Sequence, residues 1–111
     1  MRITEQRQGA VTVLKPEGPL VGADAEQVRE HVGGLVARTM GRLVLDMSGV
    51  AYVDSAGLEA LVALTEDMGA SGHALKLCAT NKTVREAMEL TDLANQFDHF
   101  DEVGNAVRSF L

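Results

Sequence analysis

One continuous run near the middle of the chain, Leu43–Leu58, constrains the fold more than any other segment. It begins with apolar residues 43–45, which are typical of a buried strand, and passes through a polar turn at 46–49. A helix then begins within residues 54–56, because apolar residues recur at three- and four-residue steps from there on. The first amides of a helix lack intrahelical acceptors and carry the positive end of its dipole. The run therefore predicts a strand, a turn and a helix start that tolerates negative charge.

Ser55 places a hydroxyl group at this helix start, directly after Asp54. Two interpretations are open. Either Asp54 or Ser55 is simply the N-cap, because both side chains can accept a hydrogen bond from a free helical amide. Alternatively, Ser55 accepts a phosphate group, because negative charge is stabilised at the helix N-terminus. The spacing alone favours the cap.

Strand and helix patterns alternate along the rest of the chain. Extended segments at 3–7 and 10–15 predict an antiparallel pair, which the prolines at 16 and 19 should end. Further strands are expected at 43–45, 74–79 and 97–100, and helices at 24–38, at 55–70, from residue 81 or 83 onward, and at 101–111. This alternation predicts one α/β domain over residues 1–111, with a mixed, mostly parallel sheet of four to five strands and about four helices.

Composition narrows the function classes. Hydrophobic residues make up 46% of the 111 residues and aromatic residues only 4%, which favours a folded core of Leu, Val, Ala and Met. A net charge of −6 disfavours attraction to nucleic acid or to an anionic membrane surface, so a protein partner or a small ligand is expected. No apolar run approaches the ~20 residues that span a bilayer, and no signal pattern precedes the first strand, so we expect a cytoplasmic protein. The single cysteine, Cys78, is expected to be a buried structural thiol.

Candidate catalytic and metal-binding groups are sparse. A nucleophilic serine needs a base, but His31, His73 and His99 belong to no recognisable nucleophile motif, and Ser55 is not in a Gly-x-Ser-x-Gly turn. One cysteine and scattered histidines give no metal-ligand spacing, and no glycine run forms a phosphate-binding loop. We therefore expect no enzyme activity, no metal and no cofactor.

The central run also carries a resemblance. Residues 54–58, Asp-Ser-Ala-Gly-Leu, follow Asp-Met-Ser at 46–48 and Tyr-Val at 52–53. This arrangement resembles the signature of bacterial anti-sigma factor antagonists of the STAS superfamily, roughly D-x-S, a short hydrophobic stretch and D-S-[ST]-G-L. Similarity extends to Gly-Pro-Leu at 18–20 and to the helix start at 81–86. The resemblance implies the STAS fold and a partner-switching role. An anti-sigma factor that is also a serine protein kinase would bind the unphosphorylated protein and then release it by phosphorylating Ser55.

Further roles follow from the same resemblance. The expected partner-binding residues are Asp46, Met47, Ser48, Asp54, Ser55, Ala56 and Gly57. Met47 is expected to be an exposed contact, because apolar residues within a polar rim often mark an interface. Asp54 would orient the hydroxyl or the kinase, Gly57 would let a partner backbone approach, and Leu58 would anchor the helix in the core. The protein itself is expected to be a monomer or a weak homodimer.

Two positions depart from the family pattern. Ala56 replaces the usual second hydroxyl residue, and Val21 stands where many antagonists carry an aspartate near the phosphorylated serine. Two alternatives therefore stay open: a constitutive STAS scaffold within a stressosome-like or lipid-transport complex, with Ser55 only a cap, and a small-ligand sensor.

Overall fold

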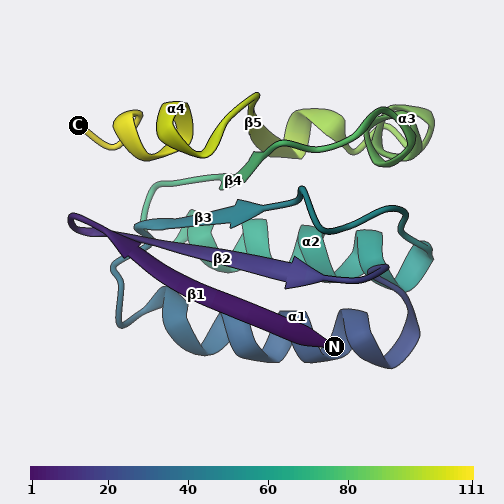
Figure 1. Cartoon of the computed structure of the whole chain (residues 1–111), viewed down its shortest axis with the longest axis horizontal. Helices are drawn as coiled ribbons and strands as arrows, with labels where there is room; N and C mark the ends of the chain where they lie inside the picture. The colour runs from purple at the N-terminus through teal and green to yellow at the C-terminus, as the bar shows by residue number, and fades with distance from the viewer.

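The computed structural model describes residues 1–111 (Figure 1). Its elements in chain order are β1 (Arg2–Gln8), β2 (Val11–Glu17), α1 (Gly22–Val36), β3 (Leu43–Asp46), α2 (Ser55–Gly69), β4 (Leu75–Cys78), α3 (Lys82–Leu90), the short 3₁₀ helix η1 (Ala94–Gln96), β5 (Phe97–Phe100) and α4 (Val103–Arg108). None of the helices combines the length and the apolar character that crossing a membrane requires.

The five strands form one sheet in the order β1-β2-β3-β4-β5. The first pair is antiparallel and the other three pairs are parallel. Each parallel pair is joined by a helical crossover, which returns the chain to the same edge of the sheet. The predicted mixed, mostly parallel α/β fold with four α-helices is confirmed, and so is the antiparallel pair at its start.

Helices cover both faces of the sheet, which explains why the central strands are apolar on both sides. Leu14, Leu45 and Leu77 pack in the main core with α1, α2 and α3. Val13 and Val44, on the opposite face, pack in a smaller core with α4. α1 and α2 lie side by side beneath the sheet (Figure 1).

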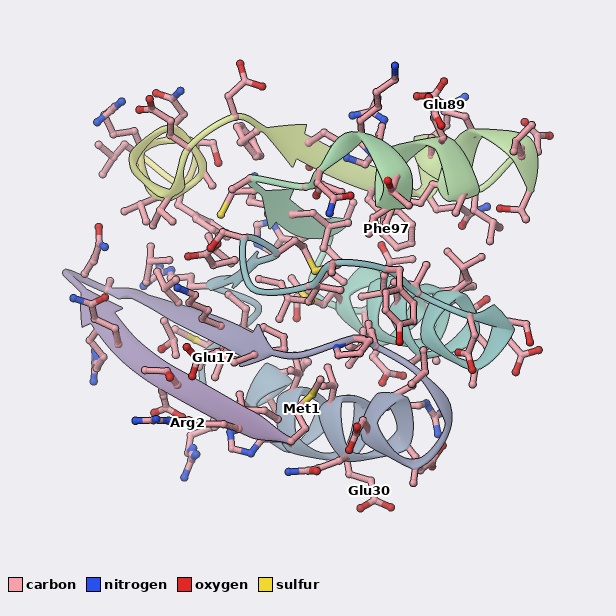
Figure 2. The ribbon with its side chains drawn as sticks, turned by 45° about the vertical axis from the view of Figure 1, so that its right-hand side comes forward. Met1, Arg2, Glu17, Glu30, Glu89 and Phe97 are labelled. Carbon is pink, nitrogen blue, oxygen red and sulfur yellow. The ribbon has the colours of Figure 1, made fainter.

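The outer surfaces of the helices carry charged side chains. Figure 2 shows Phe97 of β5 directed into the molecule, whereas Glu30 of α1 and Glu89 of α3 extend into solvent. Met68 of α2 and Met88 of α3 are fully buried on the inner faces of their helices. The amphipathic pattern thus sets the orientation of each helix on the sheet.

The expectation that Pro16 ends the first strand pair is wrong. β2 continues through Glu17, and Pro16 pairs with Ile3 of β1. The amide of Thr12 points toward the β3 side, where it donates to the carbonyl of Arg42, and every second residue has the same direction. The backbone nitrogen of Pro16 therefore points toward β3 as well. The β2–β3 ladder ends at Leu14, so the missing amide hydrogen of Pro16 removes no hydrogen bond between these strands.

Cys78 at the end of β4 is a buried thiol, as expected. Burial, reinforced by the negative charge of Asp46, raises its pKa to about 12. The thiolate is the reactive form of cysteine, so this thiol is held in an unreactive state at neutral pH.

Thr65 of α2 fastens this helix to the far half of the sheet. Its buried hydroxyl accepts a hydrogen bond from the amide of Leu75 and donates one to the carbonyl of Gln96, both at 2.9 Å. These two backbone groups lie just at the starts of β4 and β5. One hydroxyl therefore bonds two backbone groups that belong to separate elements of the chain.

Replacing Thr65 with valine should lower the free energy of unfolding by about 1–3 kcal/mol, because the shape is kept while a buried amide and a carbonyl lose their partner. Urea unfolding followed by circular dichroism measures the change. Thr65→Ser is the matched control and should lose less, since it keeps the hydroxyl. Equal stabilities for the valine and serine variants would contradict the assigned role.

Candidate functional site

The signature helix α2 begins at Ser55, and Asp54 is its N-cap. The Asp54 Oδ1 atom accepts a hydrogen bond from the amide of Gly57 at 2.9 Å. The capping prediction is therefore confirmed for Asp54. Ser55 itself is the first helical residue and is exposed, so its side chain is accessible at the positive end of the helix.

The second oxygen of Asp54 caps another helix. Its Oδ2 atom accepts a hydrogen bond from the amide of Gly22, the first residue of α1, at 3.1 Å. The N-cap residue of α1, Val21, makes no side-chain capping bond. Asp54 thus supplies from α2 the carboxylate that position 21 lacks, and two helix N-termini converge on one side chain.

Backbone contacts hold these two helix starts together. The amide of Leu20 donates to the carbonyl of Tyr52 at 3.1 Å, and the amide of Gly18 donates to the carbonyl of Gly49 at 3.0 Å. Leu20 also forms a parallel bridge with Val53. The segments before α1 and α2 therefore run side by side like a short continuation of the β2–β3 pairing.

Asn81 connects the same loop to a third helix. Its Oδ1 atom accepts from the amide of Val84 at 2.8 Å, which caps α3, while its Nδ2 atom donates to the carbonyl of Ala51 at 3.0 Å. The sequence marked Asn81 as a helix start, but its reach to the loop depends on the packing of α3. The starts of α1, α2 and α3 are thus all hydrogen-bonded to residues of the segment 50–54.

The turn after β3 divides its residues between surface and core. The Asp46 carboxylate accepts from the amide of Ser48 at 3.0 Å, and Ser48 is exposed. Met47 is fully buried, so its predicted role as an exposed contact is wrong. Residue 47 continues the strand alternation from Leu45, and side chains two residues apart point to the same face, here the main core.

Gly57 is also buried. A Cβ atom at this position would clash with the carbonyl oxygen of Leu20 within the same chain. The glycine therefore permits a close internal approach of two segments, a structural role besides the partner contact expected from the resemblance. Ala56 is half-buried against the main core, and Leu58 lies in that core as predicted.

A groove of about 420 Å³ begins at Ser55 and follows the outer face of α2. Leu58, Val62 and Leu93 give it an apolar lining, and Glu59 and Glu66 add negative charge. Val62 is half-buried, and this groove was not predicted from the sequence. The spacing of residues 55, 59, 62 and 66 was the available signal, because such steps return to one helix face.

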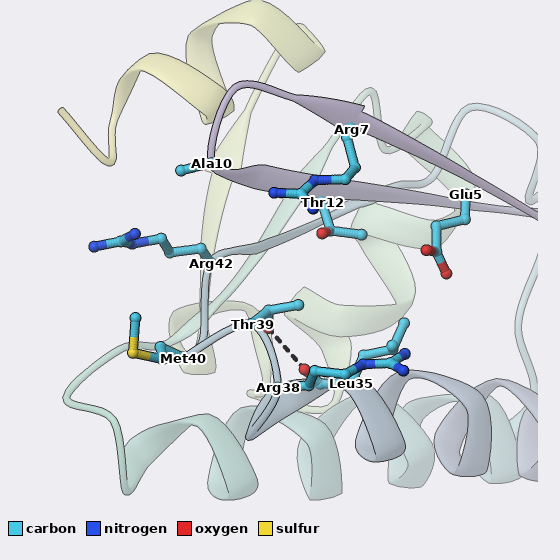
Figure 3. Close-up of a pocket in the computed structure, with 9 residues that line it drawn as sticks. All are labelled: Glu5, Arg7, Ala10, Thr12, Leu35, Arg38, Thr39, Met40 and Arg42. Atoms are coloured by element: carbon cyan, nitrogen blue, oxygen red, sulfur yellow. Dashed lines mark hydrogen bonds between the residues drawn. The ribbon is translucent and has the colours of Figure 1, made fainter.

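A second pocket, also about 420 Å³, lies at the opposite edge of the sheet, near the start of β3 (Figure 3). It is lined by the side chains of Arg7, Arg38 and Arg42, together with residues of β2 and the end of α1. Thr39 in this pocket donates to the carbonyl of Leu35. The pocket shares no residue with the signature and is separate from the groove at Ser55.

The three histidines contact other groups. The His31 ring nitrogen is 3.9 Å from a carboxylate oxygen of Glu5, and His73 packs edge-on against Phe110. His99 Nε2 lies 2.7 Å from the carbonyl oxygen of Ala94. None of these histidines is hydrogen-bonded to Ser55. A nucleophilic serine needs a base within hydrogen-bond reach, and Ser55 lacks such a histidine.

A family model for the STAS domain matches residues 2–106 of this chain. The chain belongs to the STAS domain family. A Bordetella bronchiseptica protein, BtrV, whose name describes it as an anti-sigma factor antagonist, is 26% identical over 97 residues, which cover 87% of this chain and 84% of that protein.

Solved structures share the fold of this STAS domain. A Thermotoga maritima protein described as an anti-sigma factor antagonist has a TM-score of 0.86 at 22% identity, covering 96% of this chain and 92% of the other. Unphosphorylated SpoIIAA, an anti-sigma factor antagonist from Bacillus, has a TM-score of 0.77 at 16% identity, covering 98% and 96%. The mixed five-stranded sheet with four helices is thus the STAS fold of these neighbours.

Removing the shared cap should loosen two helices at once. Asp54→Ala should lower the free energy of unfolding by roughly 1–3 kcal/mol, because the amides of Gly57 and Gly22 both lose their acceptor. Asp54→Asn should recover only part of this loss, since its single oxygen can serve one amide while its NH₂ group opposes the other. Chemical unfolding measures both, with Glu66→Ala as a control carboxylate on the same helix. A loss for Glu66→Ala as large as for Asp54→Ala would contradict the shared cap.

Proposed function

We propose that this STAS domain is an anti-sigma factor antagonist that a serine kinase switches off by phosphorylating Ser55. The observation that carries the proposal is the exposed Ser55 at a capped helix start, beside a groove. The unphosphorylated protein binds an anti-sigma factor that is also the kinase, and this frees a sigma factor in the cytoplasm. The protein acts as a binding module and not as an enzyme. Its relatives named as antagonists support this role, and SpoIIAA has been solved in both unphosphorylated and phosphorylated forms.

Electrostatics explains how phosphate would act. A phosphate group on Ser55 adds up to two negative charges directly beside Asp54. The helix start tolerates this charge, because the dipoles of α1 and α2 both present their positive ends there. The fold is therefore kept, whereas a partner that packs over Ser55 must desolvate the phosphate and meet its charge. The switch thus acts on binding and leaves folding intact.

The groove supplies the surface on which the partner docks. Its apolar lining from Leu58, Val62 and Leu93 offers area for hydrophobic contact. Tyr52, three positions before Ser55 in the chain, adds an exposed aromatic side chain that is 52% accessible. Tyrosine is enriched at interface centres. The acidic side chains of Glu59 and Glu66 favour a partner surface that carries lysine or arginine. Phosphorylated Ser55 would stand at one end of this interface.

A second candidate function is a constitutive scaffold. Asp54 already satisfies the free amides of both α1 and α2 without any phosphate, so the signature has a sufficient structural explanation. In this case Ser55 is not modified, and the groove binds a permanent partner. Incubation with the cognate kinase and ATP, followed by peptide mass spectrometry, separates the two: phosphate on Ser55 supports the switch, and phosphate only on the exposed Ser48 or Thr83 contradicts it.

Ser55→Asp should weaken anti-sigma factor binding by about 1–3 kcal/mol, a coupling typical of regulated sites, because it places a second carboxylate in the interface. Its fold should be kept, since carboxylates are favoured in the first helical turn. Ser55→Ala should bind like the unmodified protein and should stay bound when ATP is added. Titration calorimetry and thermal melts measure both variants. Equal affinities for Ser55→Asp and Ser55→Ala would remove the electrostatic switch.

Charge reversal in the groove should also weaken the partner. Glu59→Lys and Glu66→Lys should each reduce affinity severalfold and mainly slow association, because they oppose a basic partner surface. Glu30→Lys is the matched control, an exposed helical glutamate on α1 outside the groove. Surface plasmon resonance at two salt concentrations measures the rates. The same effect from Glu30→Lys would show that only net charge matters and would contradict docking at this groove.

A further inference from the structure

The chain contains three buried side-chain polar atoms without a hydrogen-bond partner, and all three belong to residues of one pocket. They are Thr80 Oγ1, Arg85 Nε and His99 Nδ1. The pocket has a volume of about 320 Å³ and is also lined by Phe100 and Asp101. Leaving a buried polar atom without a partner costs about 1–3 kcal/mol, and native proteins contain few such atoms. Their concentration at one place indicates that the pocket is built to receive a polar group.

The pocket lies where an α/β sheet commonly binds ligands. Cys78 and Phe100 are paired at the carboxyl ends of β4 and β5, and the pocket residues Ala79, Thr80 and Asp101 follow those ends. Ala79 has a positive φ of 56°, a conformation that alanine rarely adopts. Strained backbone of this kind concentrates at binding sites.

The hydrogen-bonding capacity of the pocket defines the ligand. His99 Nε2 faces the carbonyl of Ala94, which can only accept, so this nitrogen carries the proton and Nδ1 of the neutral ring is an acceptor. Arg85 can only donate, and the hydroxyl of Thr80 can donate. A matching ligand therefore accepts from Arg85 and Thr80 and donates to His99.

The charges around the pocket are mixed. Arg85 Nε lies 3.5 Å from a carboxylate oxygen of Glu89, without the geometry of a hydrogen bond, and the Arg85 side chain is 43% exposed. Asp101 adds a carboxylate to the lining. A fully deprotonated anion would meet repulsion from Asp101 and from the lone pair of His99. An anion with one protonated oxygen can donate its hydrogen to either acceptor.

We propose that this pocket binds hydrogen phosphate, a tetrahedral oxyanion that carries a P–OH group. Its anionic oxygens accept hydrogen bonds from Arg85 and Thr80, and its hydroxyl group donates to His99 Nδ1. Arg85 turns from Glu89 toward the anion, which its partial exposure allows. The site is distinct from Ser55 and does not depend on the proposed switch, since none of its residues belongs to the signature or the groove.

Titration of the ¹⁵N-labelled full chain with sodium phosphate, at pH 8.0 and constant ionic strength, tests the proposal by NMR. We expect saturable shifts at Thr80, at the Arg85 Nε–H group and at the His99 ring. Sulfate has the same shape but no proton to donate to a neutral imidazole, so it should bind at least tenfold more weakly. Methyl phosphate distinguishes free phosphate from a phosphomonoester: as a dianion it carries no O–H group that could donate to His99, and it should bind weakly.

Variants locate the site. Arg85→Gln and Thr80→Val should each weaken phosphate binding at least tenfold, whereas Arg29→Gln, an exposed arginine on α1, should leave it unchanged. Thermal melts check that each variant is folded, and Thr80→Ser, which keeps the hydroxyl, should retain binding. An absence of saturable shifts would show that the pocket holds only water. Equal binding of sulfate and phosphate, or an equal loss in Arg29→Gln, would reduce the effect to nonspecific anion binding. Each of these outcomes overturns the proposal.

Discussion

The two hydrogen bonds of the Asp54 carboxylate hold together the starts of α1 and α2 in this STAS domain. The two carboxylate oxygens bind the amide of Gly57 in α2 and the amide of Gly22 in α1. Free amides at helix starts must find acceptors, and here one side chain satisfies both helices. The two N-termini therefore meet at one point, and their dipoles create a place where negative charge is tolerated on an otherwise acidic protein.

The parallel strands explain why the start of α2 lies close to the pocket that contains Arg85 and His99. In such sheets the carboxyl ends of successive strands line up, and the loops that follow them become neighbours. The signature loop follows β3, and the pocket with Arg85 and His99 follows β4 and β5. Asn81 links these regions, because it caps α3 and also donates to the carbonyl of Ala51. The proposed switch and the proposed phosphate site thus both lie at the carboxyl ends of the parallel strands.

Packing buries some residues of the signature and leaves others exposed. Met47 fills the main core, and Gly57 lets α2 approach the carbonyl of Leu20. Both residues serve the fold, so the signature pattern alone does not mark contact residues. Ser48 and Ser55 are exposed, and Ser55 opens the groove whose sides come from α2 and from the segment after α3. Only part of the motif that identifies the family is therefore accessible at the surface.

Local sequence determined the strand and helix order, and it limited the start of α2 to residues 54–56 with Asp54 or Ser55 as the cap, because periodicity and capping act over a few neighbouring residues. It did not determine that Pro16 stays within a strand, since this depends on where the β2–β3 ladder ends. Burial of Met47, the second bond of Asp54 to Gly22 and the cluster at His99 all join residues far apart in the chain. Only the tertiary structure decides these features, because they arise where separate elements pack against one another.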